Sequence, residues 1–399
     1  MTASRLPVTA LISTSLFFTG ISFAATLPYR GIVAIEGLGI SNSAYALLMT
    51  LGAVATAGGS LALGYLADRI PDRRLLVIFC AVLGAIAHGM IFLFHTPIAY
   101  IVAYCVIMPF GGALFSQSFS FSRAYYDVHD PRRAEFMMSV LRTVFALAWV
   151  VFPPVAGWIA SAYTVFDVFG AAAAAHVVCT LVFALMLGDE RTRVGTSRRG
   201  AGHPVAEPAG GIEPGRALGI GGVTLVKVAM ALHMTTIPLA ILNDYGGTLT
   251  HVGINASLAA ALEVPCMLLW GLAASRISKE AILVINAAVY GVYLLLLFTA
   301  SSVAEVLWLQ GLNAVSTAAL LSITISYMQE AIKGRVGLST SLMDVVTVVS
   351  MLIASAVFAA LTDGASYGLV FLAAGALSIG GAGVILLSRV RRFRLATAD

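Results

Sequence analysis

The chain has 399 residues, of which 59% are hydrophobic and only 11% are charged, and its mean hydropathy is +0.95. Water-soluble proteins carry about a quarter charged residues, so this composition excludes an ordinary soluble globular protein. The net charge of +4 is small and gives no reason to expect a nucleic-acid partner. These properties indicate an integral membrane protein.

Charged residues divide the first half into apolar stretches as long as a membrane helix, which needs roughly 20 residues to cross a hydrocarbon core of about 30 Å. The long third stretch breaks at His95-Thr96-Pro97 and therefore predicts two helices. We interpret the first stretch as a helix and not as a removed signal peptide. The stretches cover residues 6–29, 37–67, 75–122 (two helices), 136–160 and 166–187.

A polar stretch rich in Gly and Pro follows at 188–215, and we expect a linker there. Beyond it come six further apolar stretches, at 217–242, 250–274, 281–300, 305–326, 337–361 and 367–388. The predicted fold is therefore an all-α membrane protein with 12 transmembrane helices. Its predicted parts are a six-helix bundle at 1–187, a cytoplasmic linker at 188–215 and a second six-helix bundle at 216–399.

Basic residues predict the orientation, because Lys and Arg concentrate in the cytoplasmic loops of membrane proteins. All but three of the 23 basic residues fall on one side of the predicted spans. The exceptions are Arg30, expected in an outer loop, and Arg142 and Lys227 within spans. Both termini are therefore expected in the cytoplasm. The four cysteines lie singly in different spans, which makes a disulfide framework or a cysteine metal site implausible.

The two halves contain a repeat. Gly64-Tyr65-Leu66-Ala67-Asp68-Arg69-Ile70 and Gly271-Leu272-Ala273-Ala274-Ser275-Arg276-Ile277 end corresponding spans and share Gly, Ala, Arg and Ile in register. Two parallel six-helix halves joined by a linker are the plan of major facilitator transporters. The stretch Gly64-x-x-x-Asp68-Arg69-Ile70-Pro71-Asp72-Arg73-Arg74 resembles the loop signature of that superfamily, with Pro71 where Gly is commoner.

Asp72 before the basic pair resembles the bacterial sugar efflux transporter subfamily. Further similar segments include Leu141-Arg142, Ala148-Trp149-Val150, Leu262-Glu263-Val264-Pro265 and Leu309-Gln310-x-Leu312-Asn313-Ala314. The resemblance implies a secondary active transporter of the bacterial inner membrane. It would export small sugars or glycosides from a central cavity by alternating access, in exchange for protons. It implies a monomer, no enzyme activity, and no cofactor or metal; the sequence has no nucleotide-binding signature.

Charged side chains within spans are costly unless paired or facing water, and are candidate functional residues. Lys227 and Glu263 are both predicted near the bilayer midplane. They are interpreted as substrate-binding residues, with Glu263 also a candidate proton carrier. A static ion pair, or side chains facing different directions, stay open alternatives.

Polar and aromatic residues in other spans complete the predicted substrate site. Asn313 and Gln310 share a helix face, and amides offer both donors and acceptors to a sugar; hydrogen bonding between helices is the alternative. Gln117 is a further candidate. Arg142 could contact substrate or brace the inner gate, and Trp149 could stack on a sugar ring or serve as core.

The predicted conformational latch consists of Gly64, Asp68, Arg69, Arg73 and Arg74, on the strength of the resemblance. Asp344, close to the cytoplasmic end of its span, is expected to be a partner of this latch or a proton-coupling site. His88, His176 and His233 are interpreted as core residues and not as a proton relay.

Two other functions stay open. Export of hydrophobic drugs or of a siderophore-like metabolite would use the many Phe and Met residues as an apolar pocket. A membrane sensor built on the same fold would need an appended soluble domain, and only eleven residues follow Ser388.

Overall fold

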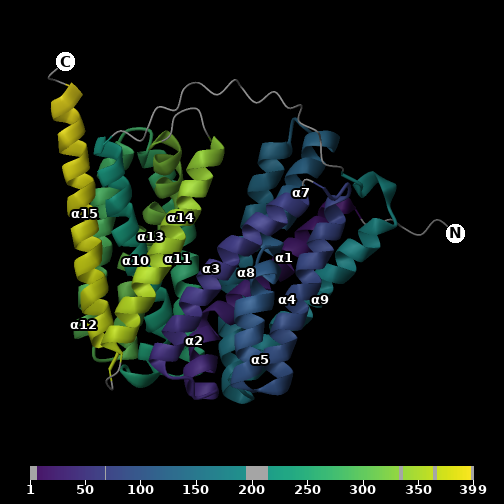
Figure 1. Cartoon of the computed structure of the whole chain (residues 1–399), viewed down its shortest axis with the longest axis horizontal. Helices are drawn as coiled ribbons and strands as arrows, with labels where there is room; N and C mark the ends of the chain where they lie inside the picture. The colour runs from purple at the N-terminus through teal and green to yellow at the C-terminus, as the bar shows by residue number, and fades with distance from the viewer. Residues whose placement is uncertain (1–6, 68, 195–213, 332–335, 363–365, 397–399) are drawn as a thin grey trace. The chain divides into compact units, whose positions relative to one another are not determined.

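The computed structural model describes the chain except residues 1–6, 68, 195–213, 332–335, 363–365 and 397–399 (Figure 1). The described residues form helices joined by short connections and contain no strand. They divide into two compact units. Unit 1 comprises Met1–Ile40 and Leu51–Ala201, and unit 2 comprises Ser41–Thr50 and Gly202–Asp399. Most of the predicted linker lies outside the described residues.

Six spans make up the N-terminal half, and two of them are assembled from several helical pieces. The first runs through Val8–Gly37 and the fourth through Pro97–His129, each with a π-helical turn. The elements are α1 (Val8–Thr26), η1 (Leu27–Tyr29), α2 (Arg30–Ile32), η2 (Val33–Gly37), α3 (Asn42–Ala67), α4 (Arg73–Phe94), α5 (Pro97–Val102), η3 (Ala103–Ile107), α6 (Met108–Gly111), α7 (Leu114–His129), α8 (Ala134–Ala162), α9 (Val165–Leu187) and η4 (Glu190–Thr192).

The C-terminal half consists of six long helices. They are α10 (Pro214–Asn243), α11 (Leu249–Ala273), α12 (Lys279–Thr299), α13 (Val303–Ala331), α14 (Val336–Leu361) and α15 (Gly368–Ala396). Of the helices in the described residues, 12 are long and apolar enough to cross a membrane. This confirms the predicted all-α fold with 12 spans.

One boundary prediction is wrong. Arg30 does not lie in a loop but in a helical stretch that continues without a break to Gly37. Its guanidinium lies over the ring of Tyr104, 5.9 Å from the ring centroid. The aromatic face attracts the cation, and the helix continues past Arg30, so this charge does not mark the end of the helix. The predicted break at His95 is confirmed, because His95 adopts a left-handed conformation with φ of 47°.

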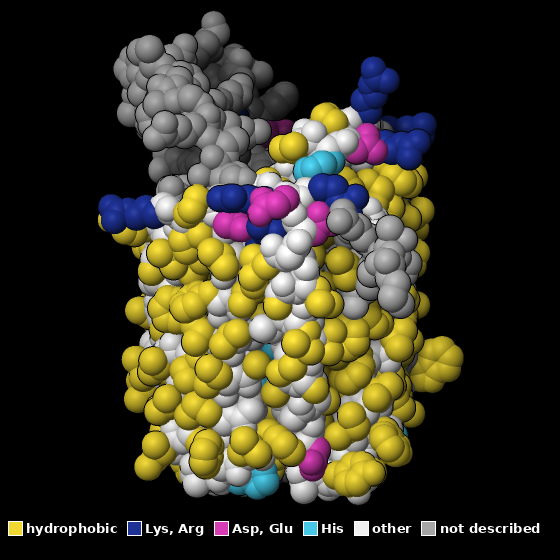
Figure 2. Space-filling view, turned by 90° about the vertical axis from the view of Figure 1, so that its right-hand side faces the viewer, with side chains coloured by type: hydrophobic (Ala, Val, Ile, Leu, Met, Phe, Trp, Pro, Cys, Tyr) yellow, Lys and Arg dark blue, Asp and Glu magenta, His cyan; other side chains and the backbone are white. Residues whose placement is uncertain are grey.

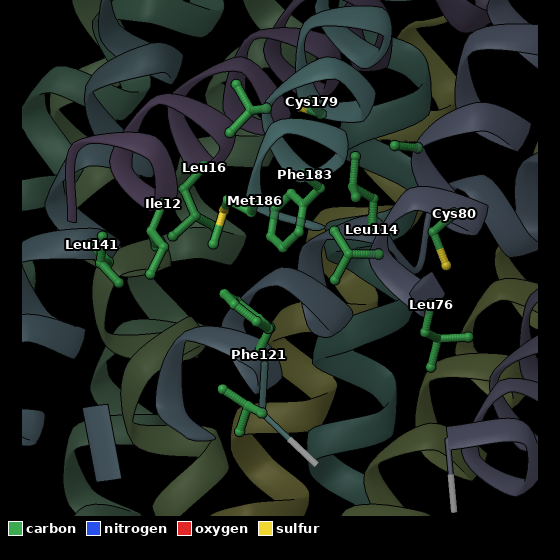
Figure 3. Packing of buried hydrophobic residues seen from close by; sticks show 14 of the residues in the cluster. Ile12, Leu16, Leu76, Cys80, Leu114, Phe121, Leu141, Cys179, Phe183 and Met186 are labelled. Atoms are coloured by element: carbon green, nitrogen blue, oxygen red, sulfur yellow. The ribbon is translucent and has the colours of Figure 1, made fainter. Parts of the chain in front are cut away.

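The core of unit 1 is built from apolar side chains that α1, α4, α7, α8 and α9 direct toward one another. Leu16, Leu114 and Phe121 are fully buried in it, and Phe183 packs edge to face on Phe121 at 5.1 Å. Figure 3 shows these side chains converging from different helices. The packing fixes the helices whose other residues carry the predicted functional groups.

Small residues allow the closest helix approaches in both units. A side chain at Gly84 of α4 would place its Cβ 2.1 Å from Cδ2 of His176 on α9, and one at Gly222 of α10 would lie 2.8 Å from the Gly381 carbonyl of α15. The rings of His88 and His176 stack at 4.9 Å in the interior of unit 1. This dense packing is typical of membrane helix bundles.

The surface of the molecule separates apolar from charged side chains. Figure 2 shows hydrophobic side chains covering the flank, and most of the visible Lys and Arg side chains gathered at one end. The apolar flank fits contact with lipid chains. The orientation of the termini stays a prediction.

Candidate functional site

A chain of hydrogen bonds between buried side chains crosses unit 2 and joins three helices. Asn313 on α13 donates from Nδ2 to Oε1 of Gln310 at 2.7 Å, and Gln310 donates from Nε2 to the Tyr293 hydroxyl at 3.2 Å. The Tyr293 hydroxyl on α12 lies 2.9 Å from Nε2 of His233 on α10. The structure thus brings the predicted residues Asn313 and Gln310 together with two residues that the predicted site did not include.

Gln310 has no exposed surface, and its side-chain nitrogen is shared between Tyr293 and the carbonyl of Val306 at 3.4 Å. Asn313 is 5% exposed, and its Oδ1 is buried without a hydrogen-bond partner in the described part of the chain. An unsatisfied buried acceptor is uncommon and costly. Asn313, and not Gln310, therefore presents the free polar atom at this place.

Glu263 on α11 presents a second such atom. Its Oε1 is also buried and has no partner among the described residues. The side chain of Thr317 on α13 contacts the Glu263 carboxyl, and the Thr317 hydroxyl donates to the backbone carbonyl of Asn313 at 2.8 Å. A further bond from Nε1 of Trp270 to the Val315 carbonyl, at 2.9 Å, fastens α11 to α13. Thr317 therefore lies next to both the Glu263 carboxyl and the backbone of Asn313.

Depth along the helices agrees with a site inside the membrane. Glu263 lies 14 residues into α11 and Asn313 lies ten residues into α13, or about 21 Å and 15 Å along the respective helix axes. Lys227 is half-buried in α10, but it forms no ion pair with Glu263 or any other described residue. The alternative of a static Lys227–Glu263 ion pair is thus not realised in this structure.

The other predicted substrate-binding residues lie in unit 1. Gln117 on α7 and Trp149 on α8 are half-buried, and Arg142 on α8 is exposed. Near Arg142, Phe145 forms an aromatic cluster with α7, its ring centroid 4.8 Å from that of Phe115. Neither Gln117 nor Arg142 has a side-chain hydrogen bond or ion pair with another described residue.

The predicted latch residues divide into exposed and buried members. Gly64 is exposed and a Cβ there would meet no neighbouring atom. Arg69 is exposed, with its guanidinium 4.1 Å from the centroid of the Tyr65 ring, and Arg73 donates to the Ser120 hydroxyl of α7 at 2.6 Å. Asp344 is exposed on α14. Asp68 lies outside the described residues.

Arg74 instead points into unit 1 and is only 2% exposed. Its guanidinium pairs with Asp72 at 2.6 Å and donates to the carbonyls of Met186 and Asp189 at 2.7 and 3.1 Å. A further bond reaches the Thr192 hydroxyl at 2.8 Å. All three guanidinium nitrogens donate in these bonds, which join the α3–α4 loop to the end of α9 and the residues after it.

Asp72 also caps the N-terminus of α4 by accepting from the backbone N–H of Arg74 at 3.0 Å. Burial opposes ionisation of Asp72, but the hydrogen bonds from Arg74 and its positive charge outweigh this effect, so the pKa of the carboxyl lies below its ordinary value of 3.8. Asp72 and Arg74 therefore form a closed structural ion pair.

Tyr293 and His233 are the two residues of the hydrogen-bond chain that sequence reasoning did not assign to the site. His233 was expected in the core, and at 8% exposure it is buried. The only signal in the sequence was the presence of polar side chains in predicted spans. Their pairing depends on which helices are neighbours, and spacing within one helix does not contain that information.

The profile of the Major Facilitator Superfamily matches the chain twice, at residues 12–225 and 219–397. The chain is 27% identical over 397 residues to sugar efflux transporter A of Dickeya chrysanthemi, covering 98% of each chain. It is 27% identical over 371 residues to sugar efflux transporter C of Escherichia coli (strain K12), covering 91% of each.

Solved structures give the same fold at much lower sequence identity. A crystal structure of a POT peptide transporter superimposes with a TM-score of 0.81 at 13% identity, covering 99% of this chain and 96% of that one. Another POT family transporter gives a TM-score of 0.79 at 11% identity, covering 98% and 99%. At this identity the likeness concerns the fold alone. The profile covers nearly the whole chain, and the protein belongs to the Major Facilitator Superfamily, a family of transporters and not of enzymes.

Proposed function

We propose that this transporter exports small sugars or glycosides across the bacterial inner membrane in exchange for protons. The observation that carries the proposal is that Oδ1 of Asn313 and Oε1 of Glu263, two of the four amide or carboxyl oxygens buried without a partner among the described residues of unit 2, lie at predicted substrate-binding positions; the other two are Oδ1 of Asn255 and of Asn286. A sugar hydroxyl is a donor that can satisfy such an atom. The similarity to proteins named sugar efflux transporters supports this substrate class.

Glu263 is the proposed proton carrier. A carboxylate without a cation partner is costly in a membrane interior, and either a proton or solute hydroxyls would satisfy it. This gives two alternative ligands for one group, as exchange of a proton for a sugar requires. Asp344 stays a second candidate for proton coupling. The proposed latch keeps Gly64, Asp68, Arg69 and Arg73, with Arg74 holding the same loop to the end of α9. The other proposed contacts of the solute are Lys227, Gln117, Arg142 and Trp149.

The test is uptake of labelled lactose into everted membrane vesicles that contain the full-length protein. With the vesicle interior acidified, wild type should accumulate lactose above the level of vesicles without the protein. Glu263→Gln should lose proton-driven accumulation at least tenfold while keeping exchange of internal for external lactose. Glu305→Gln is the control, because Glu305 is exposed at the start of α13; its uptake should stay within twofold of wild type.

The outcomes separate the alternatives. Equal losses of accumulation and exchange in Glu263→Gln would assign Glu263 to solute binding and not to proton transfer. No lactose, glucose or thiogalactoside uptake by wild type would contradict the sugar proposal. Proton-driven export of a hydrophobic cation that added sugar does not inhibit would support drug efflux instead.

A further inference from the structure

We propose that Tyr293 and His233 are positioning residues that fix which end of the Asn313 amide faces the solute. Neither touches the solute; both act through Gln310. This inference rests on the proposed function, because it takes Asn313 as a solute-binding residue. It deepens that function by assigning a role to two buried side chains on α12 and α10.

The bonds around Gln310 determine the orientation of its amide. Its Nε2 lies within hydrogen-bond distance of the Val306 carbonyl and of the Tyr293 hydroxyl, and its Oε1 faces Nδ2 of Asn313. A reversed Gln310 amide would place its oxygen against the Val306 carbonyl, where both atoms are acceptors. The observed orientation is the one in which each donor meets an acceptor.

His233 strengthens this preference by determining what the Tyr293 hydroxyl does. A phenol has one hydrogen to donate, and Nε2 of His233 lies 2.9 Å away and can accept it. The phenol oxygen can then only accept a hydrogen bond from Gln310. It therefore faces the amide nitrogen of Gln310. Without an acceptor at position 233, the phenol could donate to a reversed Gln310 instead. With His233 in the tautomer that carries its hydrogen on Nδ1, every bond runs from Asn313 toward His233.

Burial makes the arrangement rigid. Tyr293 and Gln310 have no exposed surface, and Asn313 and His233 are 5% and 8% exposed. Water therefore does not compete for these bonds, and breaking one leaves a buried polar group unsatisfied. One N–H of Asn313 Nδ2 bonds Gln310, whereas Oδ1 has no partner among the described residues and is the atom left for the solute. This acceptor suits a donor such as a sugar hydroxyl.

The experiment measures KM and maximal rate for proton-driven lactose uptake in everted vesicles. Tyr293→Phe keeps the ring and removes the hydroxyl; it should raise KM roughly three- to tenfold, the range of a lost side-chain hydrogen bond in a membrane bundle, and change the maximal rate less than twofold. His233→Phe should raise KM similarly, and His233→Gln, which restores an acceptor, should recover part of the loss. In an Asn313→Ala background, Tyr293→Phe should change KM less than twofold.

Tyr245→Phe is the matched control. The Tyr245 hydroxyl is also buried in unit 2, but it donates to the Leu297 carbonyl at 2.7 Å, outside the chain of bonds. Its KM should stay within twofold of wild type. A Tyr293→Phe loss that equals that of Tyr245→Phe, or that persists undiminished in Asn313→Ala, would overturn the inference while leaving sugar export intact. Absence of lactose uptake by wild type would instead contradict the proposed function itself.

Discussion

The Arg74 cluster and the Glu263–Asn313 cluster both place charged or polar side chains in buried positions, yet they differ in how those groups are satisfied. Arg74 is paired with Asp72 and bonds three further acceptors. Asn313 and Glu263 each keep one buried acceptor without a partner in the described residues. A closed network supports the fold of unit 1, whereas the open acceptors of unit 2 have capacity left for a ligand.

Replacement of Arg74 should change the free energy of unfolding more than replacement of Glu263 or Asp72. Arg74→Met would leave the Asp72 carboxylate buried without its partner, and loss of one member of a buried ion pair costs about 3–5 kcal/mol. We expect a correspondingly lower free energy of unfolding in detergent solution. Arg69→Met is the control, because the exposed stacking of Arg69 on Tyr65 is worth about 1 kcal/mol or less. Equal losses in the two variants would contradict the structural role of Arg74.

Replacement of Glu263 should have a smaller effect on the free energy of unfolding, and should not lower it. Glu263 is half-buried, with Oε1 buried and no cation partner among the described residues. Replacing such a carboxyl by an apolar side chain removes the cost of its burial. Glu263→Leu should therefore leave the free energy of unfolding unchanged or raise it by about 1 kcal/mol, while proton-driven lactose uptake is lost. A variant destabilised as strongly as Arg74→Met would show that Glu263 is a structural residue.

The stability that the Asp72–Arg74 ion pair contributes should depend on pH. This is the smallest of the three changes in stability. Because the pKa of Asp72 is lowered on folding, its ionised form stabilises the folded protein above the ordinary value of 3.8, and this stabilisation is lost as the pH falls below that value through the folded-state pKa. Asp72→Asn should thus be less stable than wild type at neutral pH, with the difference shrinking below pH 3.8. Unfolding midpoints at pH 3 and pH 7 measure it. A difference that does not change with pH would contradict an ionised, paired Asp72.

Much of the fold was predictable because bilayer thickness sets the spacing of charges in a membrane sequence. The break at His95 followed from the same spacing. Arg30 was misplaced because its aromatic partner, Tyr104, belongs to another span and cannot be recognised from the charge pattern.

The site was predictable in part. The positions of Glu263 and Asn313 along their helices predicted their depth, but depth alone does not say which residues face each other. Lys227 therefore appeared to be a partner of Glu263 although no ion pair forms. The adjacent side chains of Arg73 and Arg74 point in different directions, because Arg73 bonds Ser120 on α7 and Arg74 bonds Met186 on α9. The roles of Tyr293 and His233 depend on contacts between three helices.

Binding of labelled lactose to the purified protein, compared between wild type and Asn313→Ala with Tyr245→Phe as the control, tests most directly whether Asn313 binds the solute. If the open acceptor of Asn313 binds a sugar hydroxyl, Asn313→Ala should weaken binding roughly three- to tenfold, and the control should bind as wild type does. Equal affinity in Asn313→Ala and wild type would contradict solute binding by Asn313.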